Sequence, residues 1–142
     1  MRRKFSIIAV LAISIAGCTS VQVQPIDRSL GLKHVCIQEN PNAEVVDFVP
    51  TVRDGFDRHG ISTKVYKGDL PELCEFILTY ISKETWDFGA YLHHAELRLE
   101  RNGRRVAYAE YHLINKGGLS LTKWESTKTK MDPLLDEMLK AY

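Results

Sequence analysis

Two histidines and a glutamate in one predicted β-hairpin have the residue types of a metal site. The stretch YLHHAELRLERNGRRVAYAEYHLI holds two runs of strand-forming residues around Asn102-Gly103, a dipeptide typical of two-residue hairpin turns. Pairing the two strands outward from that turn places His93 opposite His112, with Glu110 on the same face. Two imidazoles and one carboxylate are ligands that zinc and iron accept, so the hairpin offers a candidate metal site.

A structural role is the interpretation that we favour for these histidines. Facing histidines at a sheet end commonly bond to backbone or solvent, or stack on aromatic neighbours such as Tyr91, and a single β-bulge would change the register. The same register puts Glu100 opposite Arg105 and leaves His94 on the other face. Because no fourth ligand is evident there, we expect no metal and no cofactor, and the metal site stays the alternative.

A second candidate for chemistry is Cys18, which ends an apolar run. Residues 2–4 are basic, and residues 5–15 carry no charge and are shorter than the ~20 apolar residues that a bilayer span needs. The run closes with Ile-Ala-Gly-Cys, which resembles the lipobox of bacterial lipoproteins. The resemblance implies a diacylglyceryl group on the Cys18 thiol, cleavage after Gly17 and acylation of the new amino terminus. A buried N-terminal helix is the alternative.

The residue after the cysteine bears on location. In Gram-negative lipoproteins an aspartate at this place favours retention in the inner membrane, whereas this chain has Thr19. The resemblance therefore implies attachment to the outer membrane, with the protein facing the periplasm. Several acyl chains anchor stably, because a single chain holds a protein only marginally.

The other two cysteines are expected to pair. With Cys18 consumed by lipid, Cys36 and Cys74 remain in an oxidising compartment, which favours a disulfide; two separate buried thiols are the alternative. The spacing is not that of a redox-active C-x-x-C pair. A loop of this length predicts about 4 kcal/mol of stabilisation from the cross-link.

Charge and length exclude some classes of partner. The 142 residues have a net charge of +1, and removal of residues 1–17 takes away three of the 19 basic residues and none of the 18 acidic ones, which leaves 125 residues at −2. A nearly neutral surface gives no reason to expect nucleic acid as a partner. The sequence also lacks G-x-S-x-G, H-E-x-x-H and P-loop motifs.

The elements that must position these residues follow from periodicity and turn signals. We expect a signal peptide over 1–17, a lipidated tether over 18–32, and one domain over 33–142. In that domain the pattern predicts strands and helices in this order: strand 33–38, helix 47–59, strand 61–67, strand 73–82, the hairpin 91–114 and a helix from Asp132-Pro133 to the end.

This order predicts an α+β fold with one mixed, mostly antiparallel sheet of four to five strands and two helices packed on one face. The first strand–helix–strand unit should be a right-handed parallel crossover. Trp86 and Phe88, in the stretch ETWDFG, are interpreted as rings that cap the core between two strands; a contact surface is the alternative.

The segments that carry a family resemblance are HVCIQENP, DFVPTVRDGFDRHGI and KMDPLLDEML, together with the lipobox. With them the sequence resembles a family of small uncharacterised proteobacterial lipoproteins. The resemblance covers residues 34–142 and brings no catalytic residue with it. It supports the domain as a free-standing unit. We expect a non-enzymatic accessory module, bound to the membrane through its lipid and docking another envelope protein. The alternative is a metal-binding or enzymatic envelope protein that uses His93, Glu110 and His112.

Overall fold

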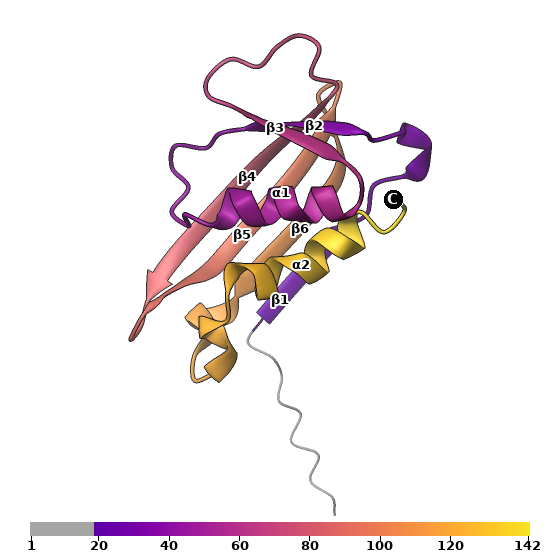
Figure 1. Ribbon diagram of the computed structural model, residues 1–142. Coiled ribbons are helices and arrows are strands. Elements are labelled where there is room, and N and C mark those ends of the chain that lie inside the picture. Colours follow the sequence, from indigo (N-terminus) through magenta and orange to yellow (C-terminus); the bar gives the residue numbers. More distant parts are fainter. Residues whose placement is uncertain (1–18) are drawn as a thin grey trace, which may run out of the picture.

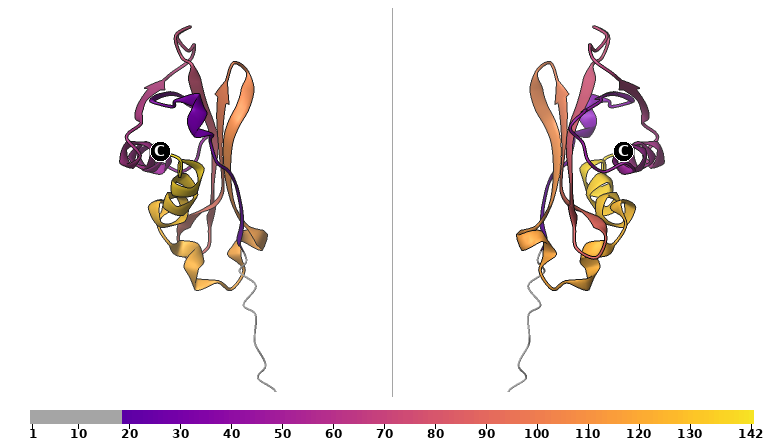
Figure 2. Two further views of the ribbon diagram at one scale, coloured as in Figure 1. Left: turned by 90° about the vertical axis from the view of Figure 1, so that its right-hand side faces the viewer. Right: turned by 90° about the vertical axis from the view of Figure 1, so that its left-hand side faces the viewer.

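A computed structural model describes residues 19–142, which form one mixed sheet with two α-helices on one face (Figures 1 and 2). The strands are β1 (Thr19–Gln24), β2 (His34–Gln38), β3 (Ser62–Tyr66), β4 (Phe76–Trp86), β5 (Ala90–Arg101) and β6 (Arg104–Leu113). The α-helices are α1 (Phe48–Arg58) and α2 (Thr127–Met138), and the short 3₁₀ turns are η1 (Arg28–Leu30), η2 (Ile114–Gly117) and η3 (Leu121–Trp124). The α+β class is confirmed, but the sheet has six strands and not four to five.

The additional strand comes from the segment expected to be a tether. β1 pairs antiparallel with β6, with Thr19 facing Leu113 and Gln24 facing Tyr108. Ile26 and Leu32, which follow β1, are buried in the core. The tether expected over 18–32 is therefore wrong from Thr19 onward, because the alternation Val-Gln-Val-Gln has a strand period that lets this segment pair with β6, and Val23 packs partly against the core.

The strand order is β1-β6-β5-β4-β2-β3. β2 runs parallel to both β3 and β4, whereas the pairs β1–β6, β6–β5 and β5–β4 are antiparallel. The parallel pairing of the first strand–helix–strand unit is confirmed, and the apolar strand β4 lies inside the sheet, as its two apolar faces predict.

Helix α1 begins and ends close to the expected residues. Asp47 precedes it, Pro50 stands in its first turn, and Gly60 follows with a φ of 71°, a conformation that suits glycine. The Asp47 carboxylate does not cap the helix, however; it accepts a hydrogen bond from the Thr127 hydroxyl at 2.8 Å, which joins the start of α1 to the start of α2.

Helix α2 begins earlier than the Asp132-Pro133 signal predicts. Ser126 is its N-cap and accepts a hydrogen bond from the backbone N–H of Thr129 at 3.1 Å. Pro133 therefore lies inside the helix. The earlier start brings Met131, which is fully buried, onto the core-facing side, and that burial outweighs the backbone hydrogen bond lost at the proline.

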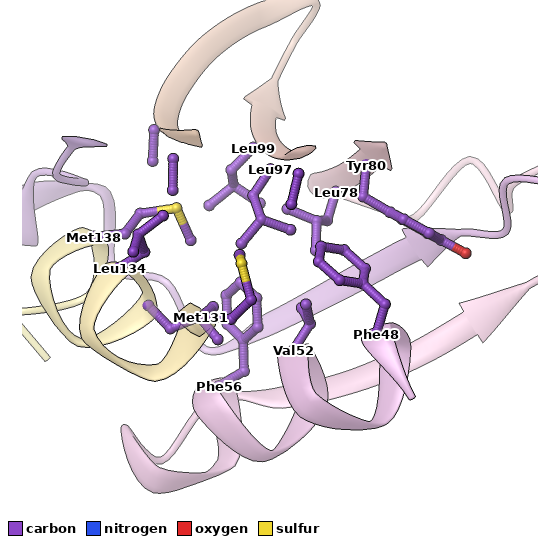
Figure 3. Close-up of a cluster of buried hydrophobic side chains, with 14 of the residues drawn as sticks. Phe48, Val52, Phe56, Leu78, Tyr80, Leu97, Leu99, Met131, Leu134 and Met138 are labelled. Carbon is purple, nitrogen blue, oxygen red and sulfur yellow. The ribbon is translucent and has the colours of Figure 1, made fainter. Parts of the chain in front are cut away.

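The core lies between the helices and one face of the sheet (Figure 3). The helices approach closely at Gly55, where a Cβ would come within 2.6 Å of the Leu135 side chain. Side chains from α1, α2 and the central strands interdigitate there: Phe48, Val52, Phe56, Leu78, Tyr80, Leu97, Leu99, Met131, Leu134 and Met138.

The disulfide is present between Cys36 of β2 and Cys74 in the loop before β4. Cys36 alternates with the core residues Val35 and Ile37, so its side chain lies on the sheet face that the helices do not cover. Among the helices of residues 19–142, none is long and apolar enough to cross a membrane.

Candidate functional site

The sheet face opposite the helices carries a group of charged and ring side chains on β5 and β6. On both strands the core residues alternate with half-buried polar ones, which the strand period directs to the other face. We call five of these residues the polar cluster: His94, Glu96, Tyr108, Glu110 and His112. Cross-strand pairing positions them, because His94 faces His112 and Glu96 faces Glu110.

Short contacts join the members of the polar cluster. His94 Nε2 lies 3.2 Å from Glu96 Oε1 and 3.6 Å from Glu110 Oε1. The Tyr108 hydroxyl donates to Glu110 Oε2 at 3.0 Å. The rings of His94 and His112 meet edge to face, with their centroids 5.0 Å apart.

The two facing carboxylates set the electrostatics of the cluster. Like charges directly opposite each other on a sheet are destabilising, and the His94 ring lies against both Glu96 and Glu110. Burial and the hydrogen bond to Glu110 raise the pKa of Tyr108 to about 12, so its hydroxyl keeps its proton.

The predicted group of His93, Glu110 and His112 is wrong in one member, since His94 takes the place of His93. The turn at Asn102-Gly103 is as expected, and Glu100 faces Arg105. The register then shifts between Leu99 and Glu100, so that Leu99 pairs with Ala107 and not with Val106. Beyond a bulge of one residue every side chain of the strand changes face relative to its partner.

His93 lies at a second irregularity of β5. Pairing with β4 skips it, because Lys83 faces His94 and Glu84 faces Leu92. Burial, together with the positive charges that His94 and other neighbours carry when protonated, lowers the pKa of His93. Because His93 lies outside the polar cluster, it does not complete a ligand set with Glu110 and His112.

The sequence held a signal for the bulge. An unbroken register would have put Leu97 and Leu99 on one face with Tyr108 and Glu110. A shift by one residue pairs those leucines with Ala107 and Ala109, and all four side chains are buried. Matching apolar with apolar positions across the hairpin would have placed the bulge between the turn and Leu99.

The side chains of the polar cluster are of types that can bind a proton or coordinate a divalent cation. One ligand atom each from His94, Glu96 and Glu110 lies within 4.8 Å of the others, which is the approach that a metal needs from its ligands. A surface depression of about 170 Å³ borders Glu96. It is smaller than the ~300–1,000 Å³ clefts that hold small-molecule ligands, so the cluster lies on a surface and not in a substrate cleft.

Trp86 and Phe88 do not cap the core. They are 74% and 91% exposed at the turn between β4 and β5, so the core-capping interpretation is wrong. Cys18 and Gly17, the residues expected to carry the lipid and the cleavage site, lie outside the described residues.

Comparisons with known proteins bear on the fold. No family model matches the sequence, and no curated protein matches it. Among solved structures, the chain is similar to PelC of Paraburkholderia phytofirmans, a dodecamer, at 15% identity and a TM-score of 0.52 over 82% of this chain and 97% of that chain. A single-substitution variant of the same dodecamer gives 16% identity with the same TM-score and coverage. At this identity the likeness shows a shared fold.

Proposed function

We propose that this chain is a lipoprotein of the outer membrane, exposed to the periplasm, that binds another envelope protein and catalyses no reaction. The lipid on Cys18 would supply location, and the domain would supply the binding surface. Confinement to a membrane raises the local concentration of a weak binder, so a modest interface suffices.

The observation that carries the proposal is the uncovered face of the strands β1, β6, β5 and β4. Both helices pack on the other face (Figure 2), and this face presents the polar cluster together with Ile81 of β4, which is 36% exposed. A broad sheet face with mixed polar and apolar groups suits a protein partner better than a small molecule.

The similarity to PelC adds support at the level of architecture. A chain of this fold serves there as a subunit of a dodecamer. Small domains of this kind can therefore be components of larger assemblies, although a shared fold does not carry a function with it.

A second candidate is a metal-binding protein, and one observation favours it. The ligand atoms of His94, Glu96 and Glu110 are already close together, with His112 adjacent. Zinc titration of the purified protein tests this candidate. Binding of one zinc per chain, lost in His94→Ala, would promote it, and we expect no such binding, because no walled cavity orients the ligands.

The experiment for the binding role measures the size of the native complex. The lipidated protein is extracted from envelopes in mild detergent and separated by native electrophoresis, with its composition read by mass spectrometry. We expect a complex that contains a second protein. Ile81→Arg, on the uncovered face, should release the chain as a monomer because it places a charge in the interface.

Leu73→Arg is the matched control, because Leu73 is 85% exposed in the loop before β4 and does not belong to any of the strands that form the uncovered face. It should leave the complex intact. A wild-type chain that migrates alone contradicts the binding role. A complex made only of this chain would replace docking to another protein with self-assembly.

A further inference from the structure

Exposed apolar side chains gather at one end of the sheet. Six of the ten large hydrophobic side chains that are exposed in residues 19–142 belong to two short segments, the β4–β5 turn and the stretch after β6. We call them the apolar end: Trp86, Phe88, Ile114, Leu119, Leu121 and Trp124. Leu119 and Leu121 are 100% and 83% exposed. Large apolar side chains that are exposed together at one end of a fold mark an interaction site.

The chain enters the fold at the same end. Thr19, the first residue of β1, pairs with Leu113, the last residue of β6. β5 runs antiparallel to β6, so its beginning and the β4–β5 turn also lie there. Figures 1 and 2 show this end, with η2 and η3 beside the start of β1.

Buried polar contacts hold the apolar end in place. Lys123 is buried, forms an ion pair with Asp87 in the β4–β5 turn, and donates to the Gly118 carbonyl at 2.9 Å. The Trp124 indole N–H donates to the Asp87 carbonyl oxygen at 2.7 Å. The Tyr91 ring meets Trp124 edge to face at 6.3 Å. These contacts fix the two segments against each other, so the exposed side chains form one preorganised surface.

Phe88 of the apolar end has a backbone conformation that is unfavourable for phenylalanine. Its φ of 59° lies in the left-handed region, which a bulky residue rarely adopts, and its ring gains little from the fold because it is almost fully exposed. Asparagine or glycine would fit the turn better. Folding alone does not explain a phenylalanine here, whereas contact with an apolar partner does.

We propose that the apolar end enters the interfacial region of the lipid bilayer. The inference rests on the lipid anchor of the proposed function, because Cys18 directly precedes Thr19 and consecutive Cα atoms are ~3.8 Å apart. An anchor at that position holds this end of the sheet against the headgroups. The chain between the lipid and β1 is too short for another protein to lie between this end and the membrane. Tryptophan and phenylalanine favour the membrane–water interface, and the ion pair with Asp87 neutralises the charge of Lys123 beneath the apolar end.

The chain offers a direct probe, because its two tryptophans, Trp86 and Trp124, both belong to the apolar end. The mature lipidated protein is reconstituted into phosphatidylcholine vesicles with or without bromine on the upper part of the acyl chains. Bromine quenches indoles that reach the acyl region. We expect roughly a twofold loss of tryptophan emission in the brominated vesicles, as for rings at the interface.

Two variants make the test specific. Leu119→Asp combined with Leu121→Asp places charges on the apolar end and should abolish most of the quenching, while the acyl chains still hold the protein on the vesicles. Leu73→Asp is the matched control, because it changes an equally exposed leucine beyond the opposite end of the sheet and should leave the quenching unchanged. All three leucines are exposed, so none of the changes removes a core contact.

The mass of the N-terminal peptide separates this inference from the anchor. Quenching in an acylated protein, lost in the double aspartate variant, supports the inference. An acylated protein whose tryptophans are unquenched by bromine overturns it while the anchor stands. Tryptophans that are shielded from aqueous acrylamide yet unquenched by bromine also overturn it, because a protein surface or a second copy then covers the apolar end. If the chain carries no acyl group, the proposed lipid anchor is wrong. Bilayer contact of the apolar end is then supported if bromine in added vesicles quenches the tryptophans, and overturned if it does not.

Discussion

The two hairpin turns of the sheet lie at opposite ends and differ in what they expose. The β5–β6 turn reads Arg-Asn-Gly-Arg-Arg, with Asn102 and Gly103 at positive φ, and is surrounded by charge. The β4–β5 turn reads Trp-Asp-Phe-Gly and exposes two aromatic rings. Both turns reverse the chain, and each places a residue other than glycine at positive φ, Asn102 in one and Phe88 in the other.

The residues of one turn are explained by folding, whereas those of the other are not. The β5–β6 turn has the residues that its geometry requires and polar flanks that water solvates. The β4–β5 turn has a phenylalanine in a left-handed conformation and rings that add little to the core. The charged end is also where the Cys36–Cys74 disulfide fixes β2 to the loop before β4. Stability should therefore depend on the charged end, and membrane contact on the apolar end.

The largest effect is expected from the disulfide. Replacing Cys36 and Cys74 together with serine should lower the free energy of unfolding by about 4 kcal/mol, because the unfolded chain regains the freedom of a closed loop. Urea denaturation measures this. Trp86→Ser, at the apolar end, should change stability by less than about 0.5 kcal/mol, since the ring is exposed. A disulfide-free protein as stable as the wild type would contradict the assignment of stability to the charged end.

A pH effect is expected next, from a lysine behind the apolar end. Lys130 is buried and donates to the Leu92 carbonyl at 3.0 Å and to the Lys123 carbonyl; burial lowers its pKa to about 8. Between pH 8 and 10 the unfolded chain keeps a proton that the folded chain has lost. Stability should therefore rise with pH in that window, by on the order of 2 kcal/mol.

Above pH 10 the sign reverses. Burial raises the pKa of Tyr108 and Tyr111 to about 12, so the folded chain keeps protons that the unfolded chain loses. Chemical denaturation at a series of pH values should show a maximum near pH 10 in the wild type. In Lys130→Met the rise below pH 10 should vanish; a rise that persists in this variant would assign the effect to another group.

A smaller effect is expected from the ion pair that joins the two segments of the apolar end. Lys123→Met should destabilise the fold by about 1–2 kcal/mol, because the Gly118 carbonyl loses its donor while Asp87 is exposed enough to be solvated by water. Hydrogen exchange should show faster opening of residues 114–124 than of β6. Lys128→Met is the control, since its pair with Asp132 lies on the exposed side of α2 and should contribute less than about 0.5 kcal/mol.

The smallest effect is a gain. Phe88→Asn should stabilise the protein by about 0.5–1 kcal/mol, because asparagine tolerates a positive φ better than phenylalanine. The same change should weaken bromine quenching of the tryptophans on vesicles. Thermal unfolding and quenching measured together distinguish a residue retained for function from one retained for folding; a loss of stability would contradict the argument from strain.

Local signals in the sequence predicted much of the fold. Asn102-Gly103 located the hairpin, the apolar stretch around Leu78 identified an interior strand, and cysteine parity predicted the Cys36–Cys74 bond. Each of these features depends on a few neighbouring residues or on a count. They survive in the folded chain because no tertiary contact opposes them.

What the sequence did not predict depends on tertiary contacts. β1 becomes a strand because β6 offers it an edge, and α2 starts at Thr127 because burial of Met131 favours a longer helix. The bulge beside Leu99, which moved the histidine of the polar cluster from His93 to His94, is the exception, because matching apolar positions across the hairpin would have located it. The exposure of Trp86 was missed since an aromatic residue at the end of a strand is usually buried.

The mass of the N-terminal peptide of protein purified from outer membranes is the most direct test of lipid attachment at Cys18. We expect a chain that begins at Cys18 and carries a diacylglyceryl group on the thiol and an acyl group on the amine, whereas Cys18→Ser should leave an unacylated, uncleaved or misprocessed precursor. A chain that retains residues 1–17, or a mature chain with an unmodified Cys18, would contradict the lipoprotein account.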